Sequence, residues 1–352
     1  MKLCILILSG LTLFSCATTK IDSSADRGIK QQSVVQTVFD NSALYQQFNQ
    51  WRTEGPVIPG LLQPLVPQGM AYWEEQDLMI ISNYMSDDSV GVLTFLKMDT
   101  EIQEKTLFLY NSDGTPHKGH LGGLALSRKY LWIASDSGVY SILLENLIST
   151  GDREKIYLPK LIETETKASF ATFYDNVLWI GEFTLKNGNY PVSETHHLVT
   201  AAGFEHLGWL GGFTLNDESD LMDLENIVSG KVYPDFILSI PDKIQGAVFF
   251  ENKIVLSESY GRKNYSRLHV YENPLSEPSQ KNGDRSFWFL DGDNKTGEII
   301  IPPMSEAVVL YENNIAVLFE SAADKYRDTA LFPLDRIQFF PIAAFNTGHR
   351  EK

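Results

Sequence analysis

A pair of short apolar strands joined by a polar turn recurs five times along this chain. Each first strand starts on small or polar residues, and each second strand ends on polar or acidic ones. The pairs occupy residues 68–83, 122–136, 169–182, 245–258 and 305–320. Their spacing leaves room in each unit for a four-stranded sheet and its loops. Runs that are apolar on both faces suit strands sandwiched between neighbouring sheets. The pattern therefore predicts an all-β chain folded as a five-bladed β-propeller of four-stranded antiparallel blades.

The two ends of this body are expected to meet in one blade. The last strand, 335–341, would pair in the fifth blade with a strand from 55–65. Residues 187–206 look like a loop inserted in the long third unit, and a sixth, degenerate blade in this region is the alternative. Helical patterns are rare, and we expect only two short helices, within 41–51 and 220–227.

The first residues have the pattern of an export signal. Met1-Lys2 supplies a positive charge, and the apolar stretch that follows is too short to span a bilayer. Leu13-Phe14-Ser15-Cys16 resembles the lipobox of bacterial lipoproteins. An ordinary signal peptide with a chance cysteine, or an uncleaved anchor, is the alternative.

This resemblance predicts the organisation of the whole chain. The lipid would anchor the protein in the cell envelope, on the extracytoplasmic side of a bacterial membrane, and would be its only membrane contact. We therefore expect a signal peptide, a lipidated cysteine with a flexible tether, one propeller domain and a polar tail, over residues 1–15, 16–40, 41–345 and 346–352.

Cysteine content and charge narrow the chemistry further. Both cysteines, Cys4 and Cys16, lie in the N-terminal segment, so the body has neither a catalytic thiol nor a disulfide. The net charge of −16 disfavours nucleic acid and anionic polymers as partners, and it leaves a cation or a small polar solute. The same charge also fits a role in solubility alone. We expect a monomer.

In a propeller, the first strand of each blade borders the central channel, so two rings of side chains should converge at one mouth. The strand starts supply Gln68, Gly122, Ser169, Gln245 and Ser305-Glu306. The ends of the second strands supply Asn83, Asp136, Glu182, Glu258 and Glu320.

Several carboxylates at one mouth will not ionise independently. They would hold a cation, share protons or pair with Lys or Arg, and blade-to-blade hydrogen bonding is the structural alternative. Oxygen-rich sites suit calcium, for which Asp136 and Glu182 are the candidate ligands. Glu258 and Glu306 are the candidate catalytic carboxyls. Gln68, Gln245 and Glu320 would contact a ligand.

Basic and imidazole side chains complete the candidate site. His120 precedes two glycines that permit close approach of the backbone, so we expect it at the channel. His117 is three residues earlier, a spacing compatible with a metal pair. Arg262 and Arg327 each follow a Glu-Ser segment and could bind an anionic group, or could close an internal salt bridge. The histidines 196 and 197 in the insertion are expected to be solvated.

Three resemblances carry further expectations. Pro67-Gln68-Gly69-Met70, the glycine-rich 119–123 stretch, Met304-Ser305-Glu306 and the 319–327 segment together resemble an uncharacterised family of secreted bacterial propeller proteins. Gln245-Gly246 followed by Glu258-Ser259-Tyr260-Gly261 is similar to the five-bladed, plant-type glutaminyl cyclases, although Ser82-Asn83 stands where their acidic residue is expected. Residue types along the channel are similar to those of calcium-dependent lactonase propellers.

The sequence thus supports three hypotheses of different kinds. The first is a propeller that binds a small polar ligand or a cation at its channel mouth. The second is a carboxylate-dependent hydrolase, or a glutaminyl-cyclotransferase-like enzyme, that uses the same residues. The third is a protein-binding scaffold that makes its contact through residues 187–206. Nucleophile-elbow, phosphate-loop and zinc-type cysteine motifs are absent from the sequence.

Overall fold

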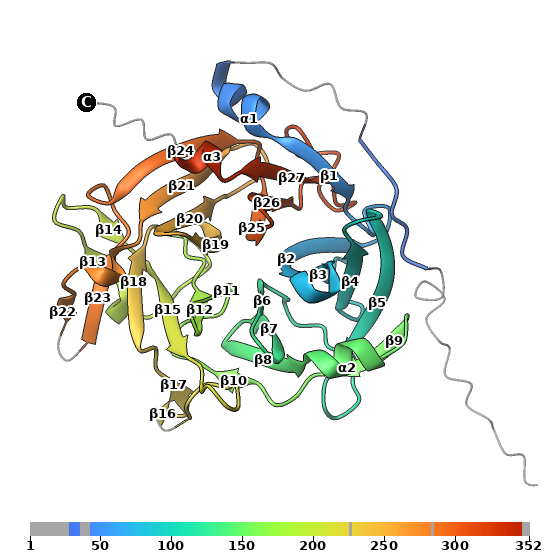
Figure 1. The fold of residues 1–352 in the computed structure, drawn as a ribbon, viewed down its shortest axis with the longest axis horizontal. Coiled ribbons are helices and arrows are strands. Elements are labelled where there is room, and N and C mark those ends of the chain that lie inside the picture. Colours follow the sequence, from blue (N-terminus) through green and yellow to red (C-terminus); the bar gives the residue numbers. More distant parts are fainter. Residues whose placement is uncertain (1–27, 36–42, 225–226, 283–284, 347–352) are drawn as a thin grey trace, which may run out of the picture.

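The computed structural model describes residues 28–35, 43–224, 227–282 and 285–346, and within them the main sheets form five blades around a central axis (Figure 1). The expected five-bladed β-propeller is therefore confirmed, and residues 187–206 do not form a sixth blade. Going around the ring, the innermost strands β2, β6, β11, β19 and β25 contact one another in that order, and β25 returns to β2.

The first three blades differ in the number of their strands. The first contains β2 (Leu65–Trp73), β3 (Leu78–Met85), β4 (Val92–Lys97), β5 (Ile102–Tyr110) and β9 (Glu154–Tyr157). The second contains β6 (Leu124–Leu126), β7 (Tyr130–Ser135), β8 (Gly138–Leu143) and β10 (Ile162–Glu163). The third contains β11 (Phe170–Tyr174), β12 (Val177–Gly181), β15 (Gly208–Thr214), β18 (Phe236–Ile240), β23 (Arg285–Phe289) and β22 (Gln280–Asn282).

The remaining blades and the small elements complete the chain. The fourth blade contains β19 (Ile244–Phe250), β20 (Lys253–Glu258), β21 (Ser266–Glu272) and β24 (Lys295–Ile301). The fifth contains β25 (Ser305–Tyr311), β26 (Asn314–Phe319), β27 (Arg336–Pro341) and β1 (Thr53–Val57). Two hairpins lie outside the blades: β13 (Leu198–Val199) with β14 (Glu205–His206), and β16 (Ile227–Val228) with β17 (Lys231–Val232). The helices are η1 (Ala43–Tyr45), α1 (Gln46–Trp51), η2 (Glu74–Gln76), α2 (Leu144–Ser149), η3 (Glu194–His196), η4 (Pro274–Ser276) and α3 (Ala343–Asn346).

The ring closes by pairing the two ends of the body, as the sequence predicted. Strand β1 runs antiparallel to β27 and forms the outer edge of the fifth blade, with Thr53 opposite Phe339. Two blades exceed the four antiparallel strands expected. In the first, β9 adds parallel to β5, and in the third, β23 adds parallel to β18 and carries β22. Segments from later in the chain thus cover the outer edges of these blades.

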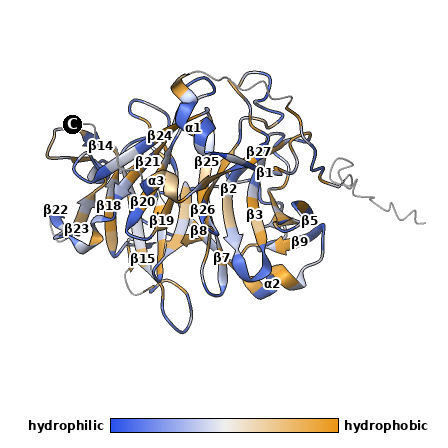
Figure 2. Ribbon diagram, turned by 45° about the horizontal axis from the view of Figure 1, so that its top comes forward, coloured by the Kyte–Doolittle hydropathy of each residue, from blue (hydrophilic) through white to orange (hydrophobic). Residues whose placement is uncertain are grey.

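The core lies between the blades. In β12 all five residues are buried, because Leu178 and Ile180 pack toward the second blade while Trp179 packs toward the fourth. Figure 2 shows hydrophobic residues concentrated on the strands near the axis and hydrophilic residues in the connecting loops. Each blade therefore buries both faces, which explains the continuous apolar runs in the sequence.

The helices agree only in part with expectation. Helix α1 lies within the expected 41–51, but α2 and α3 were not foreseen. The helix expected within 220–227 is wrong, since the described residues there are turn and strand. Asp220 instead turns its buried carboxylate to Ser127, accepting a hydrogen bond from its Oγ at 2.6 Å, and pairs with Arg128 at 3.1 Å.

Part of the expected tether lies against the propeller. Ser33 donates a hydrogen bond from Oγ to Asp335 at 2.6 Å, and the side chain of Gln31 donates to the carbonyl of Val57 at 3.0 Å. The signal peptide, Cys4 and Cys16 lie outside the described residues, as does nearly all of the polar tail. Within the described ranges, no helix is long and apolar enough to cross a membrane.

Candidate functional site

A cavity of about 670 Å³ opens at the end of the propeller axis where the inner strands begin. Every blade contributes to its lining from the start of its innermost strand or the residues just before it. These residues are Gln68, Gly122, Ser169, Gln245 and Glu306. The ring of strand starts predicted from the sequence therefore lines one cavity.

β-bulges aim three of these side chains at the axis. In β2, Pro67 pairs with Asn83 and Gly69 with Ser82, so Gln68 has no partner residue on β3. The register shifts in the same way at Gln245 in β19 and between Ser305 and Val308 in β25. A bulge places an extra residue on one strand and turns its side chain out of the ladder. The bulges thus explain why Gln68, Gln245 and Glu306 face the cavity.

The inner strands approach each other closely at this level. A β-carbon on Gly69 would lie 2.4 Å from the carbonyl oxygen of Gly122 in the next blade and 2.6 Å from Ser82 Oγ. No larger residue fits there without moving the backbone, so the glycine after Gln68 is required by blade-to-blade packing.

Glu306 and Glu320 form a pair of hydrogen-bonded carboxyls in the cavity. Glu306 is 4% exposed, and its Oε1 accepts a hydrogen bond from Gln245 Nε2 at 3.3 Å. Glu320 Oε2 accepts one from Gln68 Nε2 at 3.0 Å. Each carboxyl therefore has an amide donor supplied by a bulge.

The environment favours a proton on this pair. Burial, followed by the charge and hydrogen bond of Glu320, raises the pKa of Glu306 well above its ordinary value. Burial also raises the pKa of Glu320, although Gln68, Glu306, Lys325 and Arg262 all act in the opposite direction. The two like charges cannot both form cheaply, so the pair titrates as a unit, and Glu306 is the carboxyl whose pKa is raised further.

Aromatic side chains form the wall beside the pair. Tyr84 and Tyr326 share a hydrogen bond of 2.8 Å between their hydroxyls, and Lys325 Nζ donates to Tyr84 at 3.0 Å. The His120 ring stacks on Tyr84 with 5.4 Å between ring centroids. Desolvation lowers the pKa of His120, which favours its neutral imidazole. Of the two histidines considered, His120 lines the cavity and the buried His117 does not; its Nδ1 lies 3.0 Å from Asn111 Oδ1.

The ends of the second strands behave differently from the strand starts. Asp136 and Glu320 line the cavity, whereas Asn83, Glu182 and Glu258 do not. Second strands lie farther from the axis, so their last side chains reach it only when the following loop turns inward.

Glu182 is buried and anchors the insertion. Its carboxylate accepts hydrogen bonds of 2.9 Å from the backbone amides of Lys167 and Trp209, and lies 3.0 Å from Nδ1 of His196. His196 is 1% exposed and stacks on Trp209, so the expectation that this histidine is solvated is wrong. Glu182, proposed from the sequence as a metal ligand, uses its oxygens for these contacts and stands outside the cavity lining.

Glu258 belongs to a second carboxylate cluster, on the face of the fourth blade that meets the third. Its Oε2 lies 2.7 Å from His269 Nε2 and 3.3 Å from Arg267 Nη1, and His269 Nδ1 lies 3.3 Å from Glu298. Burial opposes ionisation of Glu258, but His269, Arg267 and Lys243 outweigh it, and the pKa is lowered. The hydrogen bond from His269 lowers the pKa of Glu298 to about 2.

The two arginines proposed as ligand contacts separate. Arg262 lines the cavity and donates a hydrogen bond from Nη1 to Thr329 Oγ1 at 2.8 Å. Arg327 does not line it. The Arg327 guanidinium binds the carbonyl of Leu61 at 2.9 Å and the carboxylate of Asp324 at 2.9 Å, and so joins the 320–327 loop to the segment before β2.

The structure adds cavity residues that the sequence did not indicate, beside Tyr260, Lys325 and Tyr326 of the two Glu-Ser segments already considered; the new ones are Tyr84, Lys167, Phe183, Asn189 and Tyr190. Asn189 and Tyr190 come from the insertion, and Tyr190 packs edge-on against Phe183 at 4.9 Å. Lys325 and Tyr326 follow Glu320 in the segment already singled out, so a search of whole loops after each second strand would have found them.

A metal centre has no ready set of ligands in the described part of the chain. No group of three or more His, Cys, Asp or Glu side chains there could hold a metal ion. The proposed ligands Asp136 and Glu182 are not brought together, because only Asp136 faces the cavity. The calcium hypothesis thus gains no support from the geometry.

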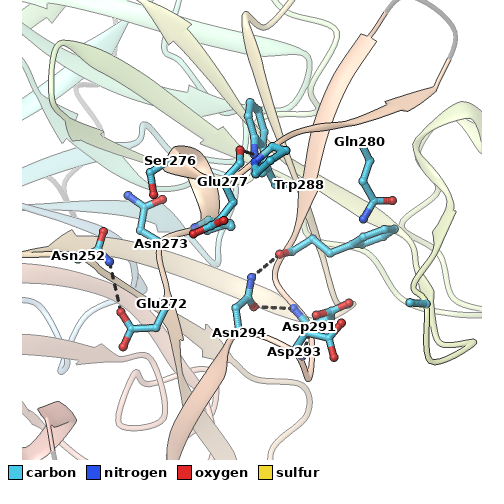
Figure 3. Close-up of a pocket in the computed structure, with 14 residues that line it drawn as sticks. Asn252, Glu272, Asn273, Ser276, Glu277, Gln280, Trp288, Asp291, Asp293 and Asn294 are labelled. Carbon is cyan, nitrogen blue, oxygen red and sulfur yellow. Dashed lines mark hydrogen bonds between the residues drawn. The ribbon is translucent and has the colours of Figure 1, made fainter.

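A second cavity, of about 470 Å³, lies between the fourth blade and the outer strands β22 and β23 of the third (Figure 3). Acidic and amide side chains surround it, among them Glu272, Glu277, Asp291 and Asn294. Many of these groups are already engaged: Asn294 Nδ2 donates to the Phe289 carbonyl at 2.7 Å, and Trp288 Nε1 donates to the Glu277 carbonyl at 2.8 Å. Its walls therefore resemble a hydrogen-bonded blade edge more than a binding site.

No protein-family model matches the chain, and no curated protein matches it. Among solved structures it is similar to the Xanthomonas citri GH43_1 enzyme complexed with xylose (TM-score 0.45, 9% identity, 85% of this chain, 93% of that one). It is also similar to Myxococcus xanthus glutaminyl cyclase (TM-score 0.36, 9% identity, 82% of this chain, 92% of that one). A third similar structure is the gluconolactonase XC5397 from Xanthomonas campestris (TM-score 0.37, 9% identity, 82% of this chain, 95% of that one).

The chain spans 58% of the length of another match, the Kuenenia stuttgartiensis hydrazine synthase chain. At such identities and TM-scores, none of these likenesses carries an argument about activity. The five-bladed architecture rests on the sheet pairing itself, and the function has to be argued from the cavity.

Proposed function

We propose that this protein is a cell-envelope propeller whose central cavity binds a small polar molecule and acts on it by general acid–base catalysis. The observation that carries the proposal is the Glu306–Glu320 pair, two hydrogen-bonded carboxyls in the cavity whose pKa values are both raised. A carboxyl with a raised pKa can donate a proton at the pH where its partner accepts one.

The roles of the two carboxyls follow from their surroundings. Glu306 is the more buried and has the pKa raised well above the ordinary value, which suits the acid. Glu320 accepts the hydrogen bond of Gln68 and is near Lys325 and Arg262, which suits the base. In hydrolysis of an ester or lactone, the oxygen of a water molecule would bond to the carbonyl carbon while Glu320 takes a proton from that water. Glu306 would give its proton to the leaving oxygen, and the pair would then re-equilibrate through its hydrogen bond.

The location in the cell envelope rests on the N-terminal sequence. A basic start, a short apolar stretch and Leu13-Phe14-Ser15-Cys16 support export and lipidation of Cys16. Mass spectrometry of the protein from its native membrane tests this part: a thioether-linked diacylglycerol on Cys16 supports it, and an unmodified or uncleaved N-terminus overturns it.

Turnover tests the catalytic part. The purified protein is assayed with δ-gluconolactone, p-nitrophenyl acetate and a peptide with N-terminal glutamine, beside Glu306→Gln and Glu312→Gln. We expect turnover of one substrate and a loss of about 100-fold in kcat/KM in Glu306→Gln, the usual contribution of a general acid. Glu312 is exposed in the β25–β26 turn, so its variant should match the wild type. Equal activity in both variants would refute the role of the pair.

A further inference from the structure

Three cationic side chains line the central cavity of a protein whose net charge is −16. Lys167 precedes β11, Arg262 follows β20 and Lys325 follows β26, so three different blades supply them. Among the described residues, no carboxylate oxygen lies within ion-pair distance of any of the three; the salt bridges found there involve other bases. Positive charge is thus concentrated at the cavity and left without a carboxylate partner.

Two of these cations are held in place by aromatic rings. The Arg262 guanidinium carbon lies 4.8 Å from the ring centroid of Tyr326, and Lys325 Nζ lies 5.0 Å from that of Tyr84. The hydrogen bond between the two tyrosine hydroxyls joins these supports into one wall. Each of these two cations donates one hydrogen bond within the protein, Arg262 to Thr329 and Lys325 to Tyr84. A lysine has three donors and an arginine five, so both side chains keep further donors for a ligand.

Lys167 acts electrostatically on the same part of the cavity as Lys325. Both Lys167 and Lys325 act on the imidazole of His120, whereas Lys325 and Arg262 act on Glu320. The three cations therefore lie around one space, with the carboxyl pair in reach of two of them. Asp136 and the Glu306–Glu320 pair are the acidic side chains of the same lining, and the raised pKa values of the two glutamates limit the negative charge that they place against the three cations. A carboxylate bound in the cavity would therefore meet three cationic side chains.

We propose that the cavity takes a small organic acid, whose carboxylate binds at Lys167, Arg262 and Lys325 while a hydroxyl or carbonyl group reaches the Glu306–Glu320 pair. Arginine matches a carboxylate with a two-pronged hydrogen bond, and lysine adds a point charge. A cavity of about 670 Å³ is the size of an ordinary small-molecule site. The ligand's role as substrate rests on the proposed function, but its binding does not.

Matched pairs of acids and amides test this inference. Lactate, gluconate and pyroglutamate are titrated calorimetrically into the purified protein at low salt, each beside its primary amide of nearly equal size. We expect at least one acid to bind about tenfold more tightly than its amide, a difference that added salt reduces. Acids that bind no better than their amides, or no binding of any acid at about 10 mM, overturn the inference. Tight binding of inorganic phosphate in their place would also overturn it.

Variants assign the effect to the cavity. The double variant Arg262→Gln/Lys325→Gln should abolish the preference for the acid. Lys263→Gln is the matched control, since Lys263 is exposed in the same loop and does not line the cavity. A preference that survives the double variant overturns the inference. Glu306→Gln separates the two proposals: if it keeps the acid preference but turnover is unaffected, only the catalytic role fails.

Discussion

Two carboxylate clusters in adjacent blades are both partly shielded from solvent, yet their pKa values move in opposite directions. Glu306 and Glu320 face each other in the cavity, with amide donors beside them, and both pKa values are raised. Glu258 and Glu298 flank His269, with Arg267 and Lys295 nearby, and both pKa values are lowered. Burial alone therefore does not decide the protonation state; the charge of the immediate neighbours does.

The comparison separates a structural cluster from a candidate site. The Glu258 cluster compensates each carboxylate with a base inside a blade interface, as expected of groups that hold sheets together. Among the described residues, the Glu306–Glu320 pair has no base within ion-pair distance, and it opens to a cavity. An uncompensated pair costs stability, and proteins retain such pairs where the protonation state serves a function.

Replacing one carboxylate in each cluster should give the largest contrast in stability. Glu258→Gln leaves His269 and Arg267 without their carboxylate, and we expect the free energy of unfolding at pH 7 to fall by about 2 kcal/mol. Glu306→Gln replaces a carboxyl whose raised pKa favours the neutral form by a neutral amide of the same shape, so no loss is expected. Urea unfolding measures both, with Glu312→Gln as a surface control. An equal loss of unfolding free energy in Glu258→Gln and Glu306→Gln would show that both clusters stabilise the fold to the same extent.

The pH dependence of stability should also have opposite signs. A carboxyl with a raised pKa binds more protons in the folded state, so the Glu306–Glu320 pair costs stability as pH rises above about 4.5, its ordinary pKa. Glu306→Gln should therefore exceed the wild type by about 1–2 kcal/mol at pH 8 and equal it at pH 4. The lowered pKa of Glu298, about 2, gives stability that is present above pH 4.5 and lost as pH falls toward 2.

Unfolding curves at several pH values measure both effects. Glu298→Gln is the counterpart variant. Its free energy of unfolding should be lower than that of the wild type above pH 4.5, and this difference should shrink as pH falls below 4.5. Parallel curves for the wild type and Glu306→Gln between pH 4 and 8 would contradict a raised pKa in the cavity.

The smallest expected effect concerns the amide donors. Gln68 Nε2 donates to Glu320 and so favours its ionised form. Gln68→Leu should raise the pKa at which Glu320 ionises, the first of the two ionisation steps of the pair, by about half to one unit. Infrared titration of ¹³C-labelled glutamate carboxyls measures the shift, with the exposed Gln76→Leu as control. An unchanged titration would mean that the hydrogen bond does not act on the pair.

The sequence was informative wherever a feature is local to a strand. Blade number, the closing strand β27 and the five strand starts could all be predicted, because apolar runs between polar turns repeat in every blade. Glu306 and His120 were singled out because a strand begins or glycines follow there. Tyr84 and Lys167 carried no comparable signal, since nothing in their own segments says that five blades bring them together.

What the chain alone determined is the repeated strand pattern, because the alternation of apolar strands and polar turns depends on neighbouring residues. The tertiary structure decided which side chains meet. Bulges turned Gln68, Gln245 and Glu306 toward the axis, and an inward loop brought Glu320 beside Glu306, whereas Glu258 at the matching position turned to His269. Glu306 and Glu320 meet because they lie at the open end of one hairpin, β25–β26, whereas Gln68 and Gln245 come from other blades and reach the two carboxyls only when the ring of blades has closed.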